Sequence, residues 1–283
     1  MSTVVASGRP VVTLPLVAHV VFRFDVGGLE NGVVNLINRL PADELRHAVI
    51  ALTEATDFAR RIGRPDVAVH ALHKKPGKDP ATYLRLFRLL RTLRPEVVHT
   101  RNLGTLDCQA VAALARIPLR IHGEHGWDIH DPDGTNRKYQ ARRRTLGPLI
   151  HRFVTVSRDL ERYLVDTVGI APAKVRRICN GVDTERFHPG ASQAAAPPAP
   201  FVVGSVTRFE PIKDPMNLVN AFLLARKALA GRPGAPDLRL VMLGDGPLRR
   251  PALAALEAAG EASHAELPGA REDVAPRLRE CHL

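Results

Sequence analysis

Short runs of apolar residues alternate with longer segments of helical period along the whole chain, and this alternation restricts the fold more than any other feature. Leu16–Phe22 has the composition of a buried strand, and apolar residues from Leu29 to Leu40 then recur on one face of a helix. The same rhythm continues through further apolar runs at 48–52, 67–72, 96–99, 119–123 and 153–156. It predicts βαβ units, and therefore an α/β fold whose parallel sheet has helices on both faces.

One segment interrupts this pattern. Gly190–Pro200 (GASQAAAPPAP) has no large apolar residue and reads as a linker. The strand and helix rhythm restarts after it, with strands expected at 201–206 and 238–243. The sequence thus predicts two Rossmann-like domains facing a cleft, at residues 1–189 and 201–283. Because the second contains only 83 residues, we expect it to be incomplete.

Charge is unevenly distributed between these parts. The net charge is +11, of which residues 1–190 carry +10 and residues 191–283 carry +1. This surplus favours anionic partners such as nucleotides, lipid headgroups or nucleic acid. The stretch Arg137–Arg144 (RKYQARRR) predicts a basic patch toward anionic lipid or a phosphorylated acceptor, with a solvated helix face as the alternative. A nucleic-acid partner is disfavoured, because no such motif is present and only 5% of residues are aromatic.

The spacing of the cysteines and the length of the apolar runs indicate the cellular compartment. The three cysteines are widely separated and form no CxxC pair, which fits a reducing cytosol better than a disulfide scaffold or a zinc site. No apolar run reaches the roughly 18 residues of a membrane span. Val11–Phe22 resembles a signal peptide but lacks a small-residue cleavage site, so a first strand is the favoured interpretation. We expect a cytoplasmic protein, with peripheral association at the inner face of the membrane as an extension of this expectation.

Two loops of the first domain carry candidate functional residues. Gly27 and Gly28, followed by Glu30, lie between the first strand and the first helix, where paired glycines let a ligand approach the helix N-terminus. His125 and Asp128 follow the strand at 119–123, and ligands of parallel sheets bind at the carboxyl ends of strands. His125 is a candidate to stabilise developing charge or to take up a proton near neutral pH. For each loop, a purely structural turn is the alternative.

The second domain carries the best phosphate chemistry in the chain. Gly204 precedes Arg208 and Lys213, whose guanidinium and ammonium groups can hold phosphate oxygens. The motif Gly244-Asp245-Gly246-Pro247 follows the next strand. Both loops are expected at one edge of the sheet, where together they predict a site for a nucleotide diphosphate.

The order of these motifs resembles glycosyltransferase family 4, enzymes of GT-B architecture, over nearly the whole chain. The stretch Gly126–Arg162 is most similar to sugar transferases of bacterial exopolysaccharide gene clusters. The matching positions are Gly27 to Glu30, the His125 loop, Ser157 with Leu160, Asn180 to Asp183 with Phe187, Gly204 with Arg208 and Lys213, and Gly244 to Pro247.

The resemblance implies a retaining transferase that moves a sugar from a nucleotide-diphosphate sugar to a glycan or lipid-linked acceptor, without a metal or other cofactor. Arg208 and Lys213 would hold the diphosphate and stabilise the leaving group, and His125 would lie beside the transferred sugar. Gly204 and the motif beginning at Gly244 would support the nucleotide. The residues that would border the acceptor and phosphate cleft are Gly27, Gly28, Glu30 and Asp128.

One feature of the family is missing from this sequence. Family members carry two glutamates, seven residues apart, after a further strand, and this chain stops where that strand is expected to start. We therefore expect a C-terminally truncated product with weak donor binding and little or no transfer. The alternative is an inactive remnant that binds a membrane or partner through its basic first domain.

Overall fold

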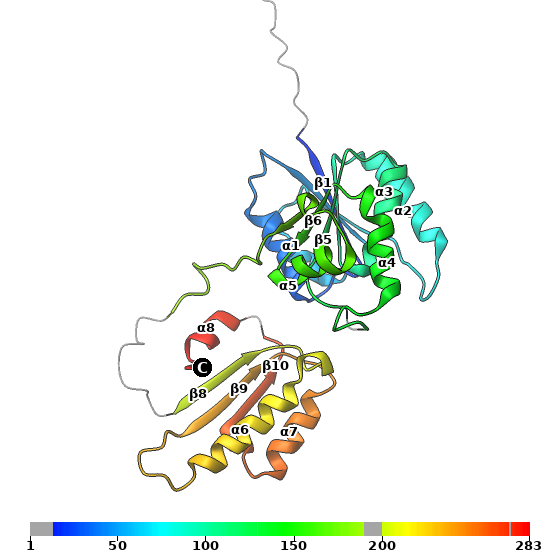
Figure 1. Ribbon diagram of the computed structural model, residues 1–283. Coiled ribbons are helices and arrows are strands. Elements are labelled where there is room, and N and C mark those ends of the chain that lie inside the picture. The colour runs from blue at the N-terminus through cyan, green and yellow to red at the C-terminus, as the bar shows by residue number, and fades with distance from the viewer. Residues whose placement is uncertain (1–13, 129, 190–199, 272) are drawn as a thin grey trace, which may run out of the picture. The chain divides into compact units, whose positions relative to one another are not determined.

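The computed structural model describes residues 14–128, 130–189, 200–271 and 273–283 (Figure 1). The chain divides into two compact units, residues 1–181, called unit 1, and residues 182–283, called unit 2. The predicted linker at 190–200 falls almost entirely outside the described residues. The described residues contain two separate parallel sheets, one in each unit, so the predicted α/β class with two Rossmann-like parts is confirmed.

Unit 1 is built on a parallel sheet of seven strands in the order β3-β2-β1-β4-β5-β6-β7. Its strands are β1 (Leu16–Val21), β2 (Arg46–Ala51), β3 (Ala68–Ala71), β4 (Val97–Arg101), β5 (Leu119–Glu124), β6 (Arg152–Thr155) and β7 (Val175–Arg177). Its helices are α1 (Gly28–Arg39), α2 (Pro80–Leu93), α3 (Cys108–Leu114), α4 (Arg137–Leu146) and α5 (Arg158–Arg162), and α5 continues as a π-helical segment, Tyr163–Val168.

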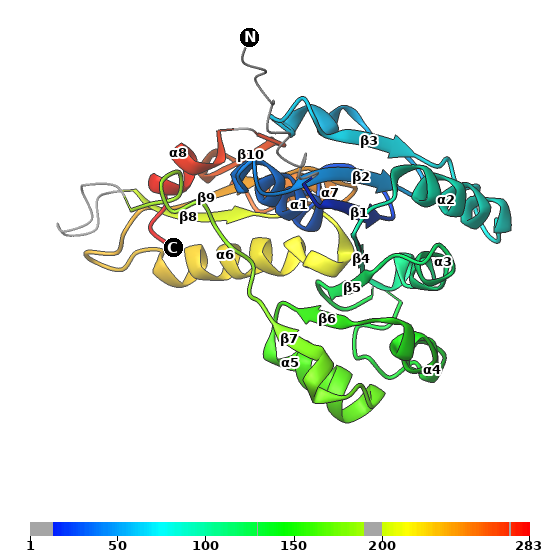
Figure 2. The same ribbon diagram turned by 90° about the horizontal axis from the view of Figure 1, so that it is seen from above.

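Helices cover both faces of this sheet, as the apolar alternation predicts (Figure 2). One face packs Ile50 and Leu52 of the β2 region with residues of α2 and α3. The opposite face packs Val49 and Ala51 with α1. Successive residues of β2 therefore enter two different cores, which explains why the strand is apolar at nearly every position.

Polar side chains fix where two helices of unit 1 begin. Ser157 Oγ accepts a hydrogen bond from Leu160 N at 3.2 Å, and Asn136 Oδ1 accepts one from Lys138 N at 3.0 Å. The segment between β2 and β3 forms a 3₁₀ turn, Asp57–Arg61, rather than an α-helix. Helix α3 begins at Cys108, after a 3₁₀ turn at Leu103–Thr105.

Unit 2 has a three-stranded parallel sheet in the order β10-β9-β8. Its elements are β8 (Phe201–Val206), α6 (Pro215–Leu229), β9 (Leu238–Leu243), α7 (Arg249–Ala258), β10 (Ala265–Gly269) and α8 (Val274–Arg279). The core packs apolar residues of α6 and α7 against Leu240 and Met242 of β9. Within the described residues, no helix of either unit is both long enough and apolar enough to cross a membrane.

Candidate active site

The loop between β1 and α1 brings its two glycines and Glu30 to the carboxyl end of the sheet. Gly27 precedes α1 in an extended conformation, and a Cβ at this position would collide with the Glu30 carboxylate. A Cβ at Gly28 would meet no atom within 4 Å. The charge of Glu30 also acts on Arg101 at the end of β4, where it opposes the effect of burial on the pKa of Arg101. A side chain at Gly27 would therefore displace the Glu30 carboxylate, whereas Gly28 leaves space above the helix N-terminus.

Arg101 organises a buried histidine cluster that the sequence interpretation missed. One terminal nitrogen of Arg101 donates to Nδ1 of His19 at 3.1 Å and to Nδ1 of His99 at 3.2 Å. Because a guanidinium only donates, both Nδ1 atoms accept and both rings carry their proton on Nε2. His19 Nε2 then donates to His47 Nδ1 at 3.0 Å. Burial, followed by the charge of Arg101, holds the pKa of His19 and His99 well below 6.5, so both rings are neutral at pH 7.

A period-2 pattern could have revealed this cluster. His99 and Arg101 occupy alternate positions of β4, and His19 pairs with His99 across β1 and β4. Residues at alternate positions of a strand lie on the same face of the sheet. Strands of a parallel sheet are usually apolar on both faces, so two polar residues at alternate positions indicate a buried polar cluster. Burial lowers the pKa of Arg101 to about 10, which still leaves it charged at pH 7.

His125 lies beside this cluster, at the carboxyl end of β5. Its main-chain N donates to Asn102 Oδ1 at 2.7 Å, which fixes the loop after β4 against the loop after β5. A Cβ at Gly123 would lie 2.5 Å from His125 Nε2 and 3.1 Å from His99 Nε2, and neither nitrogen has a hydrogen-bond partner among the described residues. Burial, followed by the charge of Arg101, lowers the pKa of His125 to about 4. The prediction that His125 takes up a proton near neutral pH is therefore wrong, and its ring is a neutral hydrogen-bonding group at pH 7.

Asp128 is placed in a tight turn. Its Oδ1 accepts a hydrogen bond from His130 N at 2.9 Å, and its carbonyl accepts one from Asp131 N at 2.9 Å. These bonds give Asp128 a role in shaping the loop after β5.

The basic stretch Arg137–Arg144 is not a continuous solvated patch. Arg143 is buried and ion-paired with buried Glu124, through Nε to Oε1 at 2.6 Å and a terminal nitrogen to Oε2 at 3.1 Å. Arg142 forms a salt bridge, and Arg144 donates to two main-chain carbonyls. The expectation of a basic face is therefore wrong for Arg143, because α4 turns this residue toward the sheet.

In unit 2, hydrogen bonds join the two predicted phosphate loops. Phe209 N donates to Asp245 O at 3.0 Å. A Cβ at Gly244 would collide with Thr207 O, and a Cβ at Gly246 would lie 2.7 Å from Phe209 O. Both glycines have positive φ, at 137° and 150°. Only glycine fits such positions, so Gly244 and Gly246 allow the two loops to meet at the carboxyl edge of the sheet, as predicted.

Arg208 and Lys213 are the free cations of these loops. Both side chains are exposed, Arg208 after β8 and Lys213 in the 3₁₀ turn Pro211–Lys213. Neither side chain makes a hydrogen bond or ion pair with any described residue, which leaves both charges available to an anionic ligand.

Gly204 and Asp245 have internal contacts that account for their residue types. A Cβ at Gly204 would collide with Cys281 Sγ, and Gly204 N donates to Leu283 O at 2.7 Å. The Asp245 Oδ1 atom accepts a hydrogen bond from Gly246 N at 2.8 Å. Gly204 thus packs against the last residues of the chain, and Asp245 stabilises the start of the loop before α7.

Two Rossmann-like units with glycine-containing loops at the carboxyl ends of their strands define the GT-B fold class. Residues 26–186, more than half of the chain, match the family model described as Glycosyltransferase Family 4. The chain belongs to this family.

Two curated relatives are glycosyltransferases. The chain is 27% identical over 184 residues to an Escherichia coli UDP-Gal:alpha-D-GlcNAc-diphosphoundecaprenol alpha-1,3-galactosyltransferase, covering 60% of this chain and 46% of that protein. It is 27% identical over 252 residues to a Corynebacterium glutamicum GDP-mannose-dependent alpha-mannosyltransferase, covering 80% of this chain and 56% of that protein. The chain thus spans about half the length of these relatives.

Solved structures share the fold. Anabaena Alr3699/HepE in complex with UDP and glucose superimposes with a TM-score of 0.69 at 17% identity, covering 94% of this chain and 72% of that one. TarM superimposes with a TM-score of 0.72 at 9% identity, covering 96% and 80%.

Proposed function

We propose that the protein acts as a retaining glycosyltransferase, which moves a sugar from a nucleotide-diphosphate sugar to a glycan or lipid-linked acceptor in exopolysaccharide biosynthesis. The observation that carries this proposal is the family match over residues 26–186, in a chain whose second unit exposes Arg208 and Lys213 beside a glycine loop. The names of both curated relatives specify nucleotide-sugar donors, and one structural neighbour was solved with UDP and glucose.

We propose that unit 2 holds the donor's diphosphate. Transfer breaks the bond between the sugar's anomeric carbon and the phosphate oxygen, and the electron pair of that bond leaves with the diphosphate. Arg208 and Lys213 would neutralise the charge that develops on this leaving group, so that no metal or other cofactor is required. The loop formed by Gly244, Asp245 and Gly246 would support the nucleotide, and Gly204 would support this loop region through its packing.

We propose that unit 1 contributes His125 to the transferred sugar. A neutral imidazole with its pKa near 4 is a poor base at pH 7, so His125 would hydrogen-bond a sugar hydroxyl rather than remove a proton. Gly27, Gly28, Glu30 and Asp128 would border the acceptor and phosphate side. The new bond joins the anomeric carbon to the acceptor oxygen, on the same face of the sugar that the phosphate occupied, and the proton of the acceptor hydroxyl passes to the departing diphosphate.

A lipid-linked acceptor would place the protein peripherally at the cytoplasmic face of the membrane, with the exposed residues Arg137 and Lys138 toward anionic headgroups. The competing function is an inactive remnant that binds a membrane or partner through unit 1.

The test is donor turnover by the chain. UDP-galactose, UDP-glucose and GDP-mannose are incubated with a synthetic polyprenyl-diphosphate sugar, and release of UDP or GDP is followed by NMR, which also reports the anomeric configuration of the product. We expect slow release with retained configuration, and loss of release in Arg208→Ala. Arg232→Ala, an exposed arginine in the turn after α6, is the matched control and should behave as the parent. Nucleotide binding without any release would instead support the inactive remnant, and inverted product would contradict retention.

A further inference from the structure

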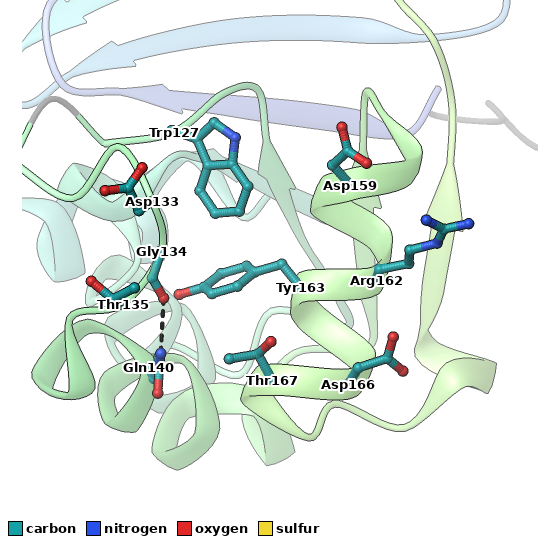
Figure 3. Close-up of a pocket in the computed structure, with 10 residues that line it drawn as sticks. All are labelled: Trp127, Asp133, Gly134, Thr135, Gln140, Asp159, Arg162, Tyr163, Asp166 and Thr167. Atoms are coloured by element: carbon teal, nitrogen blue, oxygen red, sulfur yellow. Dashed lines mark hydrogen bonds between the residues drawn. The ribbon is translucent and has the colours of Figure 1, made fainter.

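A cavity in unit 1 is not accounted for by the proposed donor chemistry. It has a volume of about 370 Å³ and lies between Trp127 and residues 133–135 on one side and the wall formed by α5 and the π-helical segment Tyr163–Val168 on the other (Figure 3). This volume is in the range of small-molecule sites. π-Helical segments are rare and frequently occur at functional sites.

Two aromatic rings form the apolar part of the cavity. Trp127 is 41% exposed, and its ring packs edge-on against Tyr163 with centroids 5.0 Å apart and an interplanar angle of 70°. Gly134 has a φ of +66°, and a Cβ there would lie 2.5 Å from the Trp127 ring and 2.9 Å from the Tyr163 ring. Gln140 Nε2 donates to Gly134 O at 2.8 Å, which holds this glycine in place (Figure 3). The two rings are thus positioned before any ligand binds.

Tyr163 also contacts a buried ion pair of unit 1. The guanidinium of Arg143 lies 5.5 Å from the centroid of the Tyr163 ring, and Arg143 is itself fixed by its two hydrogen bonds to Glu124. The Tyr163 ring is therefore held on one side by the buried Arg143–Glu124 ion pair and contacts the exposed Trp127 indole on the other. This makes it a rigid part of the cavity wall.

Four charged residues of the cavity have no partner among the described residues. The side chains of Asp133, Asp159, Arg162 and Asp166 are exposed and make no hydrogen bond or ion pair within the described part of the chain. Three carboxylates and one guanidinium give the cavity a net charge of −2, within a protein of charge +11. A nucleotide or phosphate is therefore disfavoured here. In the described ranges, no group of three acidic, histidine or cysteine residues is placed to hold a metal ion.

An uncharged sugar ring fits this combination of groups. The C–H face of a pyranose is apolar and weakly positive, and it complements the negative face of an aromatic ring such as Trp127. The hydroxyls around the ring donate hydrogen bonds to carboxylates, and such bonds to charged acceptors are the strong kind. We propose that the Trp127–Tyr163 cavity is a saccharide subsite that binds one pyranose of the acceptor. Its assignment to the acceptor rests on the proposed function.

The chain has a built-in probe for this site, because Trp127 is its only tryptophan. Methyl α-D-glucopyranoside, methyl α-D-galactopyranoside and methyl α-D-mannopyranoside are each titrated while indole emission is recorded. We expect at least one glycoside to change the emission with saturation in the millimolar range. Sorbitol has similar hydroxyls but no ring, and it should cause no saturable change. No change with all three glycosides, or an equal change with sorbitol, would overturn the proposal.

Two variants localise the effect. Asp166→Asn should weaken glycoside binding roughly tenfold, because it removes a charged acceptor from the cavity. Asp43→Asn changes an exposed aspartate of unit 1 outside the cavity and should bind as the parent does. Equal affinity in Asp166→Asn, with Trp127→Phe also unchanged by saturation-transfer NMR, would refute the site. The glycoside assay needs neither a sugar donor nor turnover. A negative result would therefore not count against donor binding at Arg208, and a negative result in the donor test would not count against glycoside binding in this cavity.

Discussion

Replacing Arg143 with alanine should destabilise unit 1 severely, because it leaves the Glu124 carboxylate buried without its main counter-charge. The side chains of Glu124 and Arg143 are 1% and 5% exposed and share two hydrogen bonds, at 2.6 and 3.1 Å. His122 Nε2 remains 3.3 Å from Glu124 Oε1 and cannot replace a guanidinium that binds both oxygens.

The magnitude follows from burial. Burial by itself would raise the pKa of Glu124, but the hydrogen bonds and charges of His122 and Arg143 outweigh it and lower the pKa from 4.5 to about 2. That difference corresponds to about 3 kcal/mol of stabilisation of the charged form. Removing one partner of a buried ion pair typically costs about 3–5 kcal/mol. We therefore expect Arg143→Ala to lose roughly 3–5 kcal/mol of unfolding free energy.

The assay is urea unfolding at pH 7, followed by the emission of Trp127 and by circular dichroism. The matched control is Arg142→Ala in the same helix, because its salt bridge with Asp107 has a distance of 2.7 Å but both side chains are about 40% exposed. Exposed pairs contribute about 0.2–1 kcal/mol. If Arg143→Ala unfolds with a loss below about 1 kcal/mol, similar to Arg142→Ala, then the assignment of a buried ion pair is wrong.

The pH dependence provides a second check on the same pair. The pKa of Glu124 is lower in the folded chain than its ordinary 4.5, so its contribution is fully present above pH 4.5 and is lost as pH falls toward 2. Arg143→Ala should reduce this loss between pH 4.5 and 2. An unchanged acid profile in the variant would contradict the coupling of these two residues.

Three further results are expected. Burial holds the pKa of His19 and His99 well below 6.5, so below this pH the unfolded chain takes up protons that the folded chain does not. The unfolding free energy should therefore fall below pH 6.5 by up to about 1.4 kcal/mol per pH unit for each ring. An unfolding free energy that stays constant from pH 6.5 to 5 in urea unfolding would contradict this. Gly244→Ala should speed hydrogen exchange throughout unit 2, because the new Cβ collides with a main-chain oxygen. Gly260→Ala is the control: its φ is +73° but its surroundings are open, so it should lower the unfolding free energy by only about 1–2 kcal/mol. Equal exchange rates in the two variants would argue against the loop contact. Arg137→Ala should weaken binding to anionic vesicles by about 1 kcal/mol, measured by flotation, and unchanged binding would remove this residue from any membrane surface.

The strand and helix framework could be predicted from the sequence because its periodicities are local. The strands at Phe201–Val206 and Leu238–Leu243 have the expected bounds, since each is a short and mostly apolar run. The contact of the two unit 2 loops was also predictable, because parallel strands place their carboxyl ends at one edge.

The interior polar contacts could not be predicted in the same way. Arg143 lies in a run of basic residues whose composition indicates a solvated surface, and only the rotation of α4 against the sheet shows that it meets Glu124. The low pKa of His125 likewise depends on burial and then on the charge of Arg101, which is 24 positions away in sequence and is brought close by the pairing of β4 with β5. Both features are set by tertiary packing, which composition and spacing do not specify.

The central claim is that the loops of unit 2 hold a nucleotide diphosphate through Arg208, and calorimetric titration of UDP and GDP tests it most directly. Charge-assisted bonds from Arg208 contribute roughly 1.5–3 kcal/mol, so Arg208→Ala should weaken binding about tenfold to a hundredfold. Lys213→Ala should weaken it less, because a flexible ammonium is less preorganised than a guanidinium, and Arg232→Ala should leave it unchanged. If Arg208→Ala binds UDP and GDP as tightly as the parent chain, the donor site is not where we place it.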